Sequence, residues 1–287
     1  MTSAQRHDDS ASARHLIGRL VGSASLEIIP LKGAEAKVRA AALGTTMTIT
    51  CSPRFGLDRT LEHVATAVAS GYRVVPHLAA RMVEDEWALR RFVSRIVSLG
   101  VDDLYVIGGD ADEPVGKFSG AEQVLDVLRD FDHGLTRVGV GCYSEGHPKI
   151  ADSVLLDALL AKQVHADYMV SQLCFDSTAL VRWLDDIRAR GVRLPLRIGL
   201  AGPIRTARLV ELSVKIGVGQ SLRYLTKQHG MVGGLLLGRS YAPEKLLLGV
   251  GERLGSPDLA VEGLHIFTFN QVDVTVAWQR RVAEVGA

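Results

Sequence analysis

The sequence shows no surplus of either charge: 33 lysine and arginine residues stand against 32 aspartate and glutamate residues. Proteins that hold a polyanion by displacing its counterions need an excess of positive charge. Nucleic acid is therefore not an expected partner. Long apolar runs are lacking as well, because no stretch is both long enough and sufficiently free of charge to span a bilayer. We therefore expect no membrane contact.

Cysteine is scarce. Cys51, Cys142 and Cys174 lie far apart and form no Cys-x-x-Cys pair. This usage is typical of reduced thiols in a cytoplasmic protein, where a thiol more often acts as a small buried hydrophobe than as a reactive group. The run from Met1 to Ser12 also lacks the apolar core of a signal peptide. We expect residues 1–22 to form a flexible tail and a short helix (13–22), and residues 23–287 to form one domain.

Several catalytic motifs are missing. The nine histidines include no His-x-His or His-Glu-x-x-His spacing, so the sequence predicts no metal site. No Gly-x-Ser-x-Gly marks a serine nucleophile. No Gly-x-Gly-x-x-Gly follows a first strand, since Gly139-Val-Gly141 is interrupted by Ser144, and this argues against an open dinucleotide-binding sheet.

The sequence does contain a repeated alternation of strand-like and helical runs. Most strand-like runs are followed by apolar residues at helical spacing; residues 83–99, for example, are expected to place Trp87, Phe92 and Ile96 inward. Eight such repeats without a shift in composition predict a single α/β domain, the (β/α)8 or TIM barrel. The strand-like runs are 24–30, 45–50, 73–79, 103–110, 137–143, 168–175, 195–202 and 263–270.

Two carboxylates belong to these strands. Asp110 follows Gly108 and Gly109 at the end of the fourth strand, where parallel α/β proteins keep their chemistry; the alternative is a plain helix or turn cap. Glu27 lies inside the first strand, so it faces either the barrel interior or the helices. A carboxyl group deprived of water favours its protonated form, which suits a general acid. The alternative is a structural Glu paired with a cation at the barrel floor.

The other polar residues at strand ends admit two interpretations each. Gln172 in the sixth strand is suited to the edge of a heterocycle, or it ties strands together. His77 is a ligand contact or a core histidine. Tyr143 offers an aromatic face, His147 lies in the loop beyond it, and Asn270 ends the last strand. Together these groups suit proton transfer and charge stabilisation on a bound planar molecule better than hydrolysis.

These residues lie in motifs that resemble those of the methylenetetrahydrofolate reductases, in the same order from Leu26 to Gln271. Each motif is weak by itself, but six in register make a specific joint signal. The matches are Leu26-Glu-Ile-Ile-Pro30 (Phe-Glu-Phe-Phe-Pro in the family), Pro76-His-Leu78 (Pro-His-Leu), Gly109-Asp110 (Arg-Gly-Asp), Tyr143-Ser-Glu-Gly-His-Pro148 (Tyr-Pro-Glu-x-His-Pro), Ser171-Gln-Leu-Cys-Phe-Asp176 (Thr-Gln-x-x-Phe-Asp) and His265-Ile-Phe-Thr-Phe-Asn270 (His-x-Tyr-Thr-Leu-Asn).

The resemblance implies reduction of 5,10-methylenetetrahydrofolate to 5-methyltetrahydrofolate with NAD(P)H. Glu27 would be the general acid that opens the imidazolidine ring, Asp110 would stabilise the resulting cation, and Gln172 would hold the pterin, so that all three contact the substrate. In the family a flavin, usually FAD, relays the hydride. The positions around that flavin correspond to His77, Gly109, Asp110, Tyr143 and His147 here.

Two departures from the family concern the flavin. Gly108 stands where the family has the arginine of Arg-Gly-Asp, and residues 155–161, which match a helix that holds the FAD ribose and diphosphate, contain no cation; only Lys162 lies nearby. Each missing charge-assisted hydrogen bond removes about 1.5 to 3 kcal/mol of binding. Our hypothesis is that FAD binds weakly or not at all and that NADH delivers the hydride directly. The alternative is that Lys117 or Lys149 replaces the lost contacts.

Two other function classes stay open at this point. One is a paralogue that binds a folate without turnover, although binding alone would not need a buried acid such as Glu27. The other is an aldolase-like barrel, although no lysine ends a strand where a Schiff base would need one. The sequence favours NADH without excluding NADPH, and it leaves a homo-oligomer open.

Overall fold

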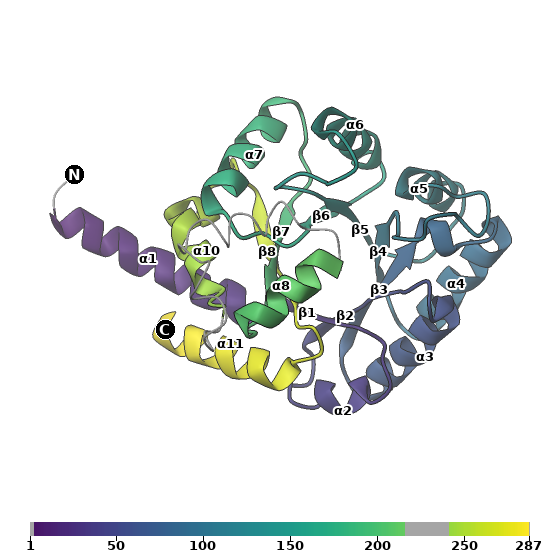
Figure 1. Cartoon of the computed structure of the whole chain (residues 1–287), viewed down its shortest axis with the longest axis horizontal. Coiled ribbons are helices and arrows are strands. Elements are labelled where there is room, and N and C mark those ends of the chain that lie inside the picture. Colours follow the sequence, from purple (N-terminus) through teal and green to yellow (C-terminus); the bar gives the residue numbers. More distant parts are fainter. Residues whose placement is uncertain (1–2, 216–240, 287) are drawn as a thin grey trace.

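The computed structural model describes residues 3–215 and 241–286, and its centre is a closed parallel barrel of eight strands in sequence order (Figure 1). The TIM barrel and all eight expected strands are therefore confirmed. The strands are β1 (Ser25–Ile28), β2 (Thr46–Ile49), β3 (Arg73–Ala79), β4 (Asp103–Ile107), β5 (Arg137–Cys142), β6 (Tyr168–Ser171), β7 (Leu196–Ala201) and β8 (Val261–Phe267).

The helices surround this barrel. They are α1 (Ser3–Gly22), α2 (Ala34–Val38), α3 (Gly56–Ala69), α4 (Glu86–Ser98), α5 (Ala121–Arg129), α6 (Asp152–Lys162), α7 (Ser177–Ala189), α8 (Thr206–Lys215), α10 (Glu244–Val250) and α11 (Val272–Gly286), with short 3-10 turns η1 (Ala80–Met82) and η2 (Gly251–Gly255). None of them within the described ranges is long and apolar enough to cross a membrane.

The helices differ from expectation in two places. The first helix begins at Ser3 rather than Ala13, so most of the segment expected as a tail has a helical backbone; it extends away from the barrel, while the C-terminal end of α1 contacts α11 (Figure 1). The five-residue helix α2 was not expected. Further helical pieces were expected after Ile216 and up to Leu254. Of that stretch, residues 216–240 lie outside the described residues.

Trp87 was expected inward and is instead 65% exposed. Asp85 caps α4 by accepting a hydrogen bond from the amide of Ala88 (2.7 Å), so the helix begins at Glu86. At 100° per residue, Trp87 then lies about half a turn away from the buried Ile96. The guanidinium of Arg91 lies 4.6 Å above the centroid of its ring. Hydrophobicity alone suggested the wrong face.

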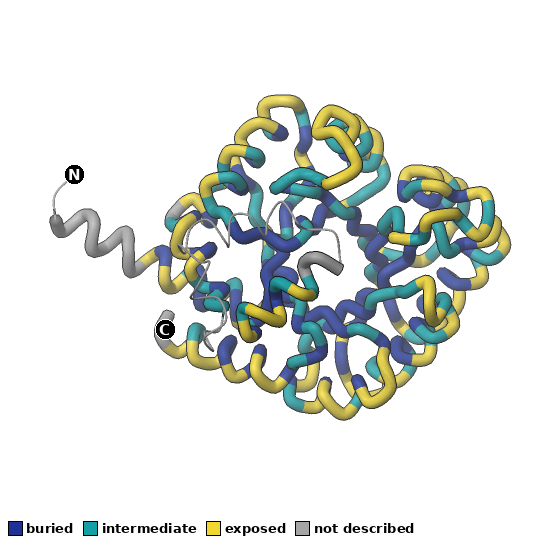
Figure 2. Tube along the Cα trace, in the orientation of Figure 1, coloured by how far each residue is buried: buried dark blue, intermediate teal, exposed yellow. Residues whose placement is uncertain are grey.

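The outward faces of the strands form the main hydrophobic core. Residues that alternate along each strand, such as Leu26 and Ile28 on β1 or Met47 and Ile49 on β2, are buried against the helices. Figure 2 shows this layer as dark blue along the strands and the inner sides of the helices. Most apolar contacts that stabilise the barrel therefore lie outside it, and the inward positions hold polar residues beside a smaller apolar cluster around Val75, Tyr105 and Val170.

We call the end of the barrel at which the strands begin the lower end, and the end at which they finish the upper end. In the lower interior, large side chains lie opposite glycines on the neighbouring strand. Tyr168 on β6 is 1% exposed and lies against Gly139 on β5, while the guanidinium of Arg197 lies 3.7 Å above the tyrosine ring. Tyr168 donates a hydrogen bond to Asp103 (2.7 Å), and Glu262 accepts one from Arg197 (2.7 Å). Burial raises the pKa of Asp103, against the opposing effects of Tyr168 and Arg197.

These groups, completed by Arg137, form what we call the floor network: Asp103, Arg137, Tyr168, Arg197 and Glu262. Arg137 donates to both carboxylate oxygens of Glu262 at 2.9 and 3.0 Å. Each charge has a partner of opposite sign, which offsets the cost of removing the two most enclosed ones, Asp103 and Arg197, from water. The floor network thus fills the end of the barrel at which the strands begin.

At the opposite end, α8 crosses in front of the strands while the other helices surround them (Figure 1). Its residue Leu209 is fully buried in a small apolar cluster with Leu173 and Phe175, which follow β6, and with Phe267 at the end of β8. The helix α8 therefore packs on the carboxyl ends of β6 to β8.

The fit between Tyr168 and Gly139 generates a stability prediction. A Cβ atom at position 139 would lie 2.2 Å from Cζ of Tyr168. Because overpacking a core costs about 1 to 3 kcal/mol, Gly139→Ala should lower the free energy of unfolding by that amount in urea titrations. The control is Gly22→Ala, whose Cβ would meet only Ala283 at 3.9 Å. Equal unfolding midpoints for the two variants would contradict the described packing.

Candidate active site

The upper interior of the barrel contains a carboxylate and an imidazole in direct contact. Glu27 points inward, and its Oε2 lies 3.0 Å from Nε2 of His265 on β8. Their exposed fractions are 9% and 1%. The contact spans the β1–β8 pair, in which Glu27 is in register with Phe267. Of the two sides that the sequence left open for Glu27, the structure selects the interior.

Ser25 completes a short chain of polar groups. Its hydroxyl donates to the carbonyl of Leu264 (3.3 Å) and lies 3.5 Å from Nδ1 of His265. A neutral imidazole bears its proton on either nitrogen. With the proton on Nδ1, beside Ser25, Nε2 accepts a hydrogen bond from a protonated Glu27; with the proton on Nε2, the ring donates to the carboxylate. The geometry therefore allows one proton to be shared along the contact between Glu27 and His265.

His77 on β3 faces the same space. It is 3% exposed, and within the described part of the chain its Nε2 has no hydrogen-bond partner. Burial, with a smaller contribution from His265, lowers its pKa well below the usual value, so the ring is neutral. The ring of Tyr105 on β4 meets it edge to face at 4.6 Å between centroids. Burial raises the pKa of Tyr105 far above its usual value and keeps it a phenol.

Asp110 lies at the rim of the barrel, three residues after β4, and is exposed. Its charge acts on Cys51, Tyr143 and His147, which places it near the exits of β2 and β5. Cys51 also feels the charge of Glu27; burial first, and then these two carboxylates, raise the pKa of the thiol to about 12. Glu27 and Asp110 are thus both within electrostatic range of one thiol at the same end of the barrel.

Tyr143 and His147 form one side of this rim. Their rings meet edge to face with centroids 5.0 Å apart. Burial and then the charge of Asp110 raise the pKa of Tyr143, while burial lowers that of His147 against the opposing effect of Asp110. At neutral pH this side of the rim presents two uncharged rings to a planar ligand.

The loop that bears Asp110 is fastened by Arg81 of η1. The guanidinium donates to the carbonyls of Ala111 (2.8 Å), Asp112 (2.6 Å) and Ser119 (3.2 Å). The backbone of Arg81 also donates to Gly108 and accepts from Val115. Five hydrogen bonds therefore hold the two ends and the middle of the loop on the exit of β3.

Gly109 explains how closely that loop approaches β3. Its φ of +96° is in the region that favours glycine, and a Cβ there would lie 2.8 Å from Cβ of Ala79. The glycine before Asp110 is therefore required by backbone conformation and close packing. Its expected role as a flavin contact stays a prediction.

Gln172 follows β6, on the neighbouring side of the rim. Its side chain is half-buried, and its Oε1 accepts a hydrogen bond from the amide of Leu173 (2.9 Å). The loop is fixed from β5 by Glu145, whose Oε1 accepts hydrogen bonds from the amides of Phe175 (2.6 Å) and Asp176 (2.9 Å). No described hydrogen bond joins Gln172 to Glu27 or Asp110, so its contact with a substrate stays a prediction.

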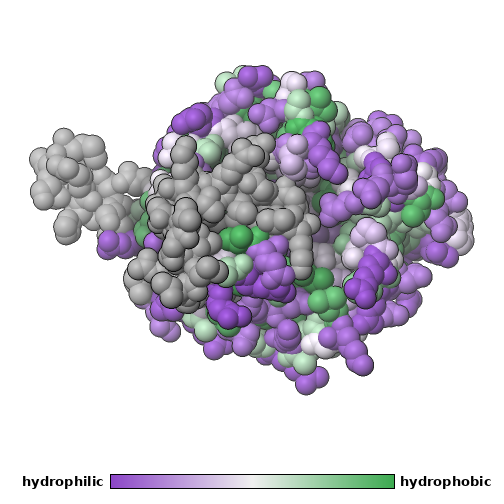
Figure 3. All heavy atoms as spheres, in the orientation of Figure 1, coloured by the Kyte–Doolittle hydropathy of each residue, from purple (hydrophilic) through white to green (hydrophobic). Residues whose placement is uncertain are grey.

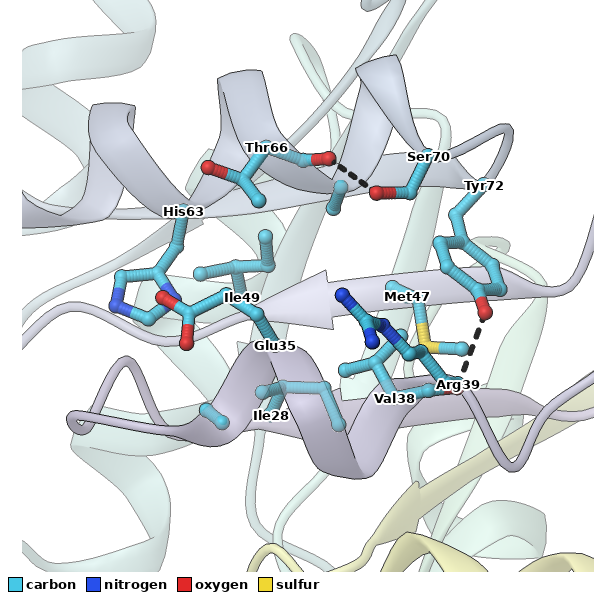
Figure 4. A pocket seen from close by; sticks show the side chains of 12 residues that line it. Ile28, Glu35, Val38, Arg39, Met47, Ile49, His63, Thr66, Ser70 and Tyr72 are labelled. Atoms are coloured by element: carbon cyan, nitrogen blue, oxygen red, sulfur yellow. Dashed lines mark hydrogen bonds and ion pairs between the residues drawn. The ribbon is translucent and has the colours of Figure 1, made fainter.

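A separate small pocket lies outside the barrel, between α2, α3 and the outward face of β1 and β2 (Figure 4). Glu35 and His63 meet at one end of it (3.2 Å) and Tyr72 stands at the other, whereas Glu27 and Thr48 point to the opposite side of the same strands. This pocket is therefore not continuous with the polar interior. On the face drawn in Figure 3, hydrophilic residues cover most of the outer part and small hydrophobic patches lie nearer the centre.

Comparison with known families settles which proteins these motifs belong to. The family model described as "Methylenetetrahydrofolate reductase" matches residues 35–219, a range that contains His77, Asp110, Tyr143, His147 and Gln172. The chain belongs to the methylenetetrahydrofolate reductase family. Glu27 and His265 lie outside the matched range, so their roles rest on the geometry and on the sequence motifs.

Solved structures resemble this family member only distantly. They include a putative lyase/mutase from Burkholderia cenocepacia J2315 (TM-score 0.48, 14% identity, covering 96% of this chain and 88% of that one). A mandelate racemase/muconate lactonizing enzyme from Bordetella bronchiseptica RB50 reaches 0.44 at 14% identity, covering 89% and 59%. The dihydropteroate synthase of Thermus thermophilus reaches 0.43 at 16%, covering 92% of each chain. Similarity this low bears on neither activity nor ligand.

Methylenetetrahydrofolate reductases typically use FAD and NAD(P)H, so the residues here can be tested against the FAD diphosphate. The ammonium group of Lys162 donates to the carbonyl of Gly141 (2.9 Å) beneath β5, and burial lowers its pKa. Lys117 is paired with Glu86 (2.5 Å). The first two turns of α6 bear Asp152 and Asp157 and no cation. Among these groups the described structure therefore offers a diphosphate no unpaired cation; Lys149, whose charge acts on His147, is the remaining candidate to hold one.

Sequence reasoning missed four residues of this site. His265 was part of a motif but was given no role, and Ser25, Arg81 and Glu145 were not singled out. His265 contacts Glu27 across 238 positions of sequence, so no local pattern connects them. Arg81 and Glu145 act through backbone groups of other loops, which leave no signature in residue types.

The role of Arg81 can be measured by amide exchange. Arg81→Ala removes three hydrogen bonds from a charged donor, each worth about 1.5 kcal/mol or more, so exchange of the amides between 110 and 119 should accelerate about tenfold or more. The matched control is Arg91→Ala, which loses only a contact with the exposed Trp87. Unchanged exchange in Arg81→Ala would show that the loop is held by other contacts.

Proposed function

We propose that this protein reduces 5,10-methylenetetrahydrofolate to 5-methyltetrahydrofolate, with NADH as the direct hydride donor. The observation that carries the proposal is the buried Glu27 inside the barrel, hydrogen-bonded to His265 and at the same end as Asp110. Family membership supplies the substrate class. The barrel supplies a proton donor shielded from water, which this reduction needs and which binding alone does not.

The first step is a proton transfer. A protonated Glu27 gives its proton to the bridging nitrogen N10 of the folate, and the bond between N10 and the methylene carbon breaks. The electron pair of that bond stays on N10, and the methylene becomes an iminium cation with N5. The carboxylate left behind is stabilised by hydrogen bonding from His265, which can also return a proton for the next cycle.

The second step is a hydride transfer. NADH gives a hydride from its nicotinamide ring to the methylene carbon, so the iminium is reduced to a methyl group and NADH is oxidised to NAD+. One proton and one hydride are consumed for each folate, which balances the reaction. The exposed carboxylate of Asp110 stabilises the cation that forms between the two steps, and Gln172 contacts the pterin.

Direct hydride transfer is proposed because the lysines near α6 are poorly placed to hold the diphosphate of a bound flavin. A permanently bound flavin needs charge-assisted hydrogen bonds to its diphosphate, and Lys162 and Lys117 already have partners. NADH carries a diphosphate as well, but as a substrate that leaves after each turnover it does not need such lasting anchorage. The uncharged rings of Tyr143 and His147 at the rim can accept a nicotinamide as readily as another planar ring. NADH is favoured over NADPH because the 2′-phosphate that NADPH carries in addition to the diphosphate would need a further cation.

The acid role of Glu27 is tested by substitution. Glu27→Gln keeps the shape and removes the acidic proton, so the rate of NADH oxidation with methylenetetrahydrofolate should fall about 100- to 10,000-fold. The matched control is Glu113→Gln, an exposed carboxylate in the loop after β4, which should leave the rate unchanged. A parent protein without turnover would instead support a folate-binding paralogue, and a Glu27→Gln variant with normal turnover would remove Glu27 from the mechanism.

Flavin independence has a separate test. The purified full-length chain should show no flavin absorbance after gel filtration, and added FAD should leave the rate of NADH oxidation unchanged. The measurement is a visible spectrum of the protein peak together with the rate at several FAD concentrations. A yellow protein that retains one FAD per chain would contradict direct transfer and would leave the folate reaction itself in place.

A further inference from the structure

Three side chains that are remote in sequence bring metal-ligating atoms together inside the barrel. They are Glu27 on β1, His77 on β3 and His265 on β8, and their ligating atoms all lie within 4.8 Å of one another. All three residues are buried, with exposed fractions of 9%, 3% and 1%. Two imidazole nitrogens and one carboxylate oxygen form a ligand set that divalent transition metals prefer.

One of these groups has no function in the proposed reaction. Proton transfer uses Glu27 and His265, whereas the Nε2 atom of His77 is buried and, among the described residues, unpartnered. The hydroxyl of Thr48 is also buried without a partner, and Thr48 is the register partner of Glu27 on β2. Buried polar atoms without partners are costly, so two of them near one carboxylate point to a bound ligand.

We propose that Glu27, His77 and His265 bind a divalent transition metal ion of the zinc class when the folate is absent. Among the described residues, the Nε2 atom of His77 has no hydrogen-bond partner and faces the ligand atoms of Glu27 and His265, and the carboxyl group of Glu27 supplies the oxygen ligand. Bonds of about 2.0 to 2.2 Å to zinc require ligand atoms about 3.3 Å apart. The contact between Glu27 and His265 already has that spacing, so closure needs a small movement of His77.

Metal and folate should exclude each other, and this part rests on the proposed function. A carboxylate that is bound to a metal ion cannot keep the proton that opens the folate ring. The ion would also occupy the space between His77 and His265 toward which the substrate must approach Glu27. The metal is therefore an inhibitor of the reductase, and a bound folate protects the site.

The first experiment uses cobalt as a spectroscopic probe for zinc. The metal-free full-length chain is titrated with Co2+, and visible absorption bands should appear with one equivalent and disappear when Zn2+ displaces the cobalt. His77→Ala should weaken Co2+ binding at least tenfold, and His77→Gln serves if the alanine variant does not fold. His165→Ala, which removes a partly exposed histidine beside Asp126, should bind as the parent does. Absent bands, or equal binding by parent and His77 variants, would overturn the proposed site.

The second experiment tests exclusion. Zn2+ should inhibit NADH oxidation in the parent, with inhibition relieved by higher methylenetetrahydrofolate or by a chelator. Zinc that binds with one equivalent and leaves turnover unchanged would overturn the exclusion. If the metal-free parent shows no turnover, the proposed function fails, while the cobalt spectra still decide the metal site.

Discussion

The hydrogen bond between Glu27 and His265 depends on how the barrel closes, and the proposed chemistry depends on that bond. The last strand meets the first in one register, and two contacts beyond the strand ends secure it. Thr268 donates to the carbonyl of Glu27 (2.6 Å), and the side-chain amide of Asn270 both donates to and accepts from the backbone of Ile29 (2.9 Å each). A slip of one residue would turn Glu27 toward the helices, because strand side chains alternate. The same register of β1 and β8 therefore both closes the barrel and places Glu27 in its interior.

The barrel can hold polar side chains inside because each strand buries apolar residues on its outward face. Outward residues such as Leu26 and Met47 give the barrel its apolar contacts, so inward positions need not be apolar. Large inward side chains are fitted by glycine on the neighbouring strand, as Tyr168 is by Gly139. Charges at the lower end are neutralised within the floor network, whereas the groups at the upper end keep atoms without protein partners. Within the described barrel interior, the buried polar atoms without partners, on Thr48 and His77, therefore lie at the same end as Glu27.

Much of the fold could be predicted from the sequence because strand positions depend on local patterns. Runs such as Thr45 to Thr50 are rich in β-branched residues, and all eight were found where expected. It was harder to predict toward which side of a strand each side chain points, since strands buried on both sides show no alternation of polarity. For that reason the orientation of Glu27 stayed ambiguous. Trp87 was misplaced because a single apolar residue does not define a helix face. The pairing of Glu27 with His77 and His265 could not be predicted, because β1, β3 and β8 meet only through closure of the sheet.

The floor network has a kinetic consequence. Tyr168 lies against the guanidinium groups of Arg137 and Arg197 and fills the lower end of the barrel. In the proposed reaction, folate and nucleotide therefore reach Glu27 from the carboxyl ends of the strands. When both share that approach, the molecule that binds deeper arrives first and departs last, so the proposed two-substrate reaction is expected to follow an ordered addition.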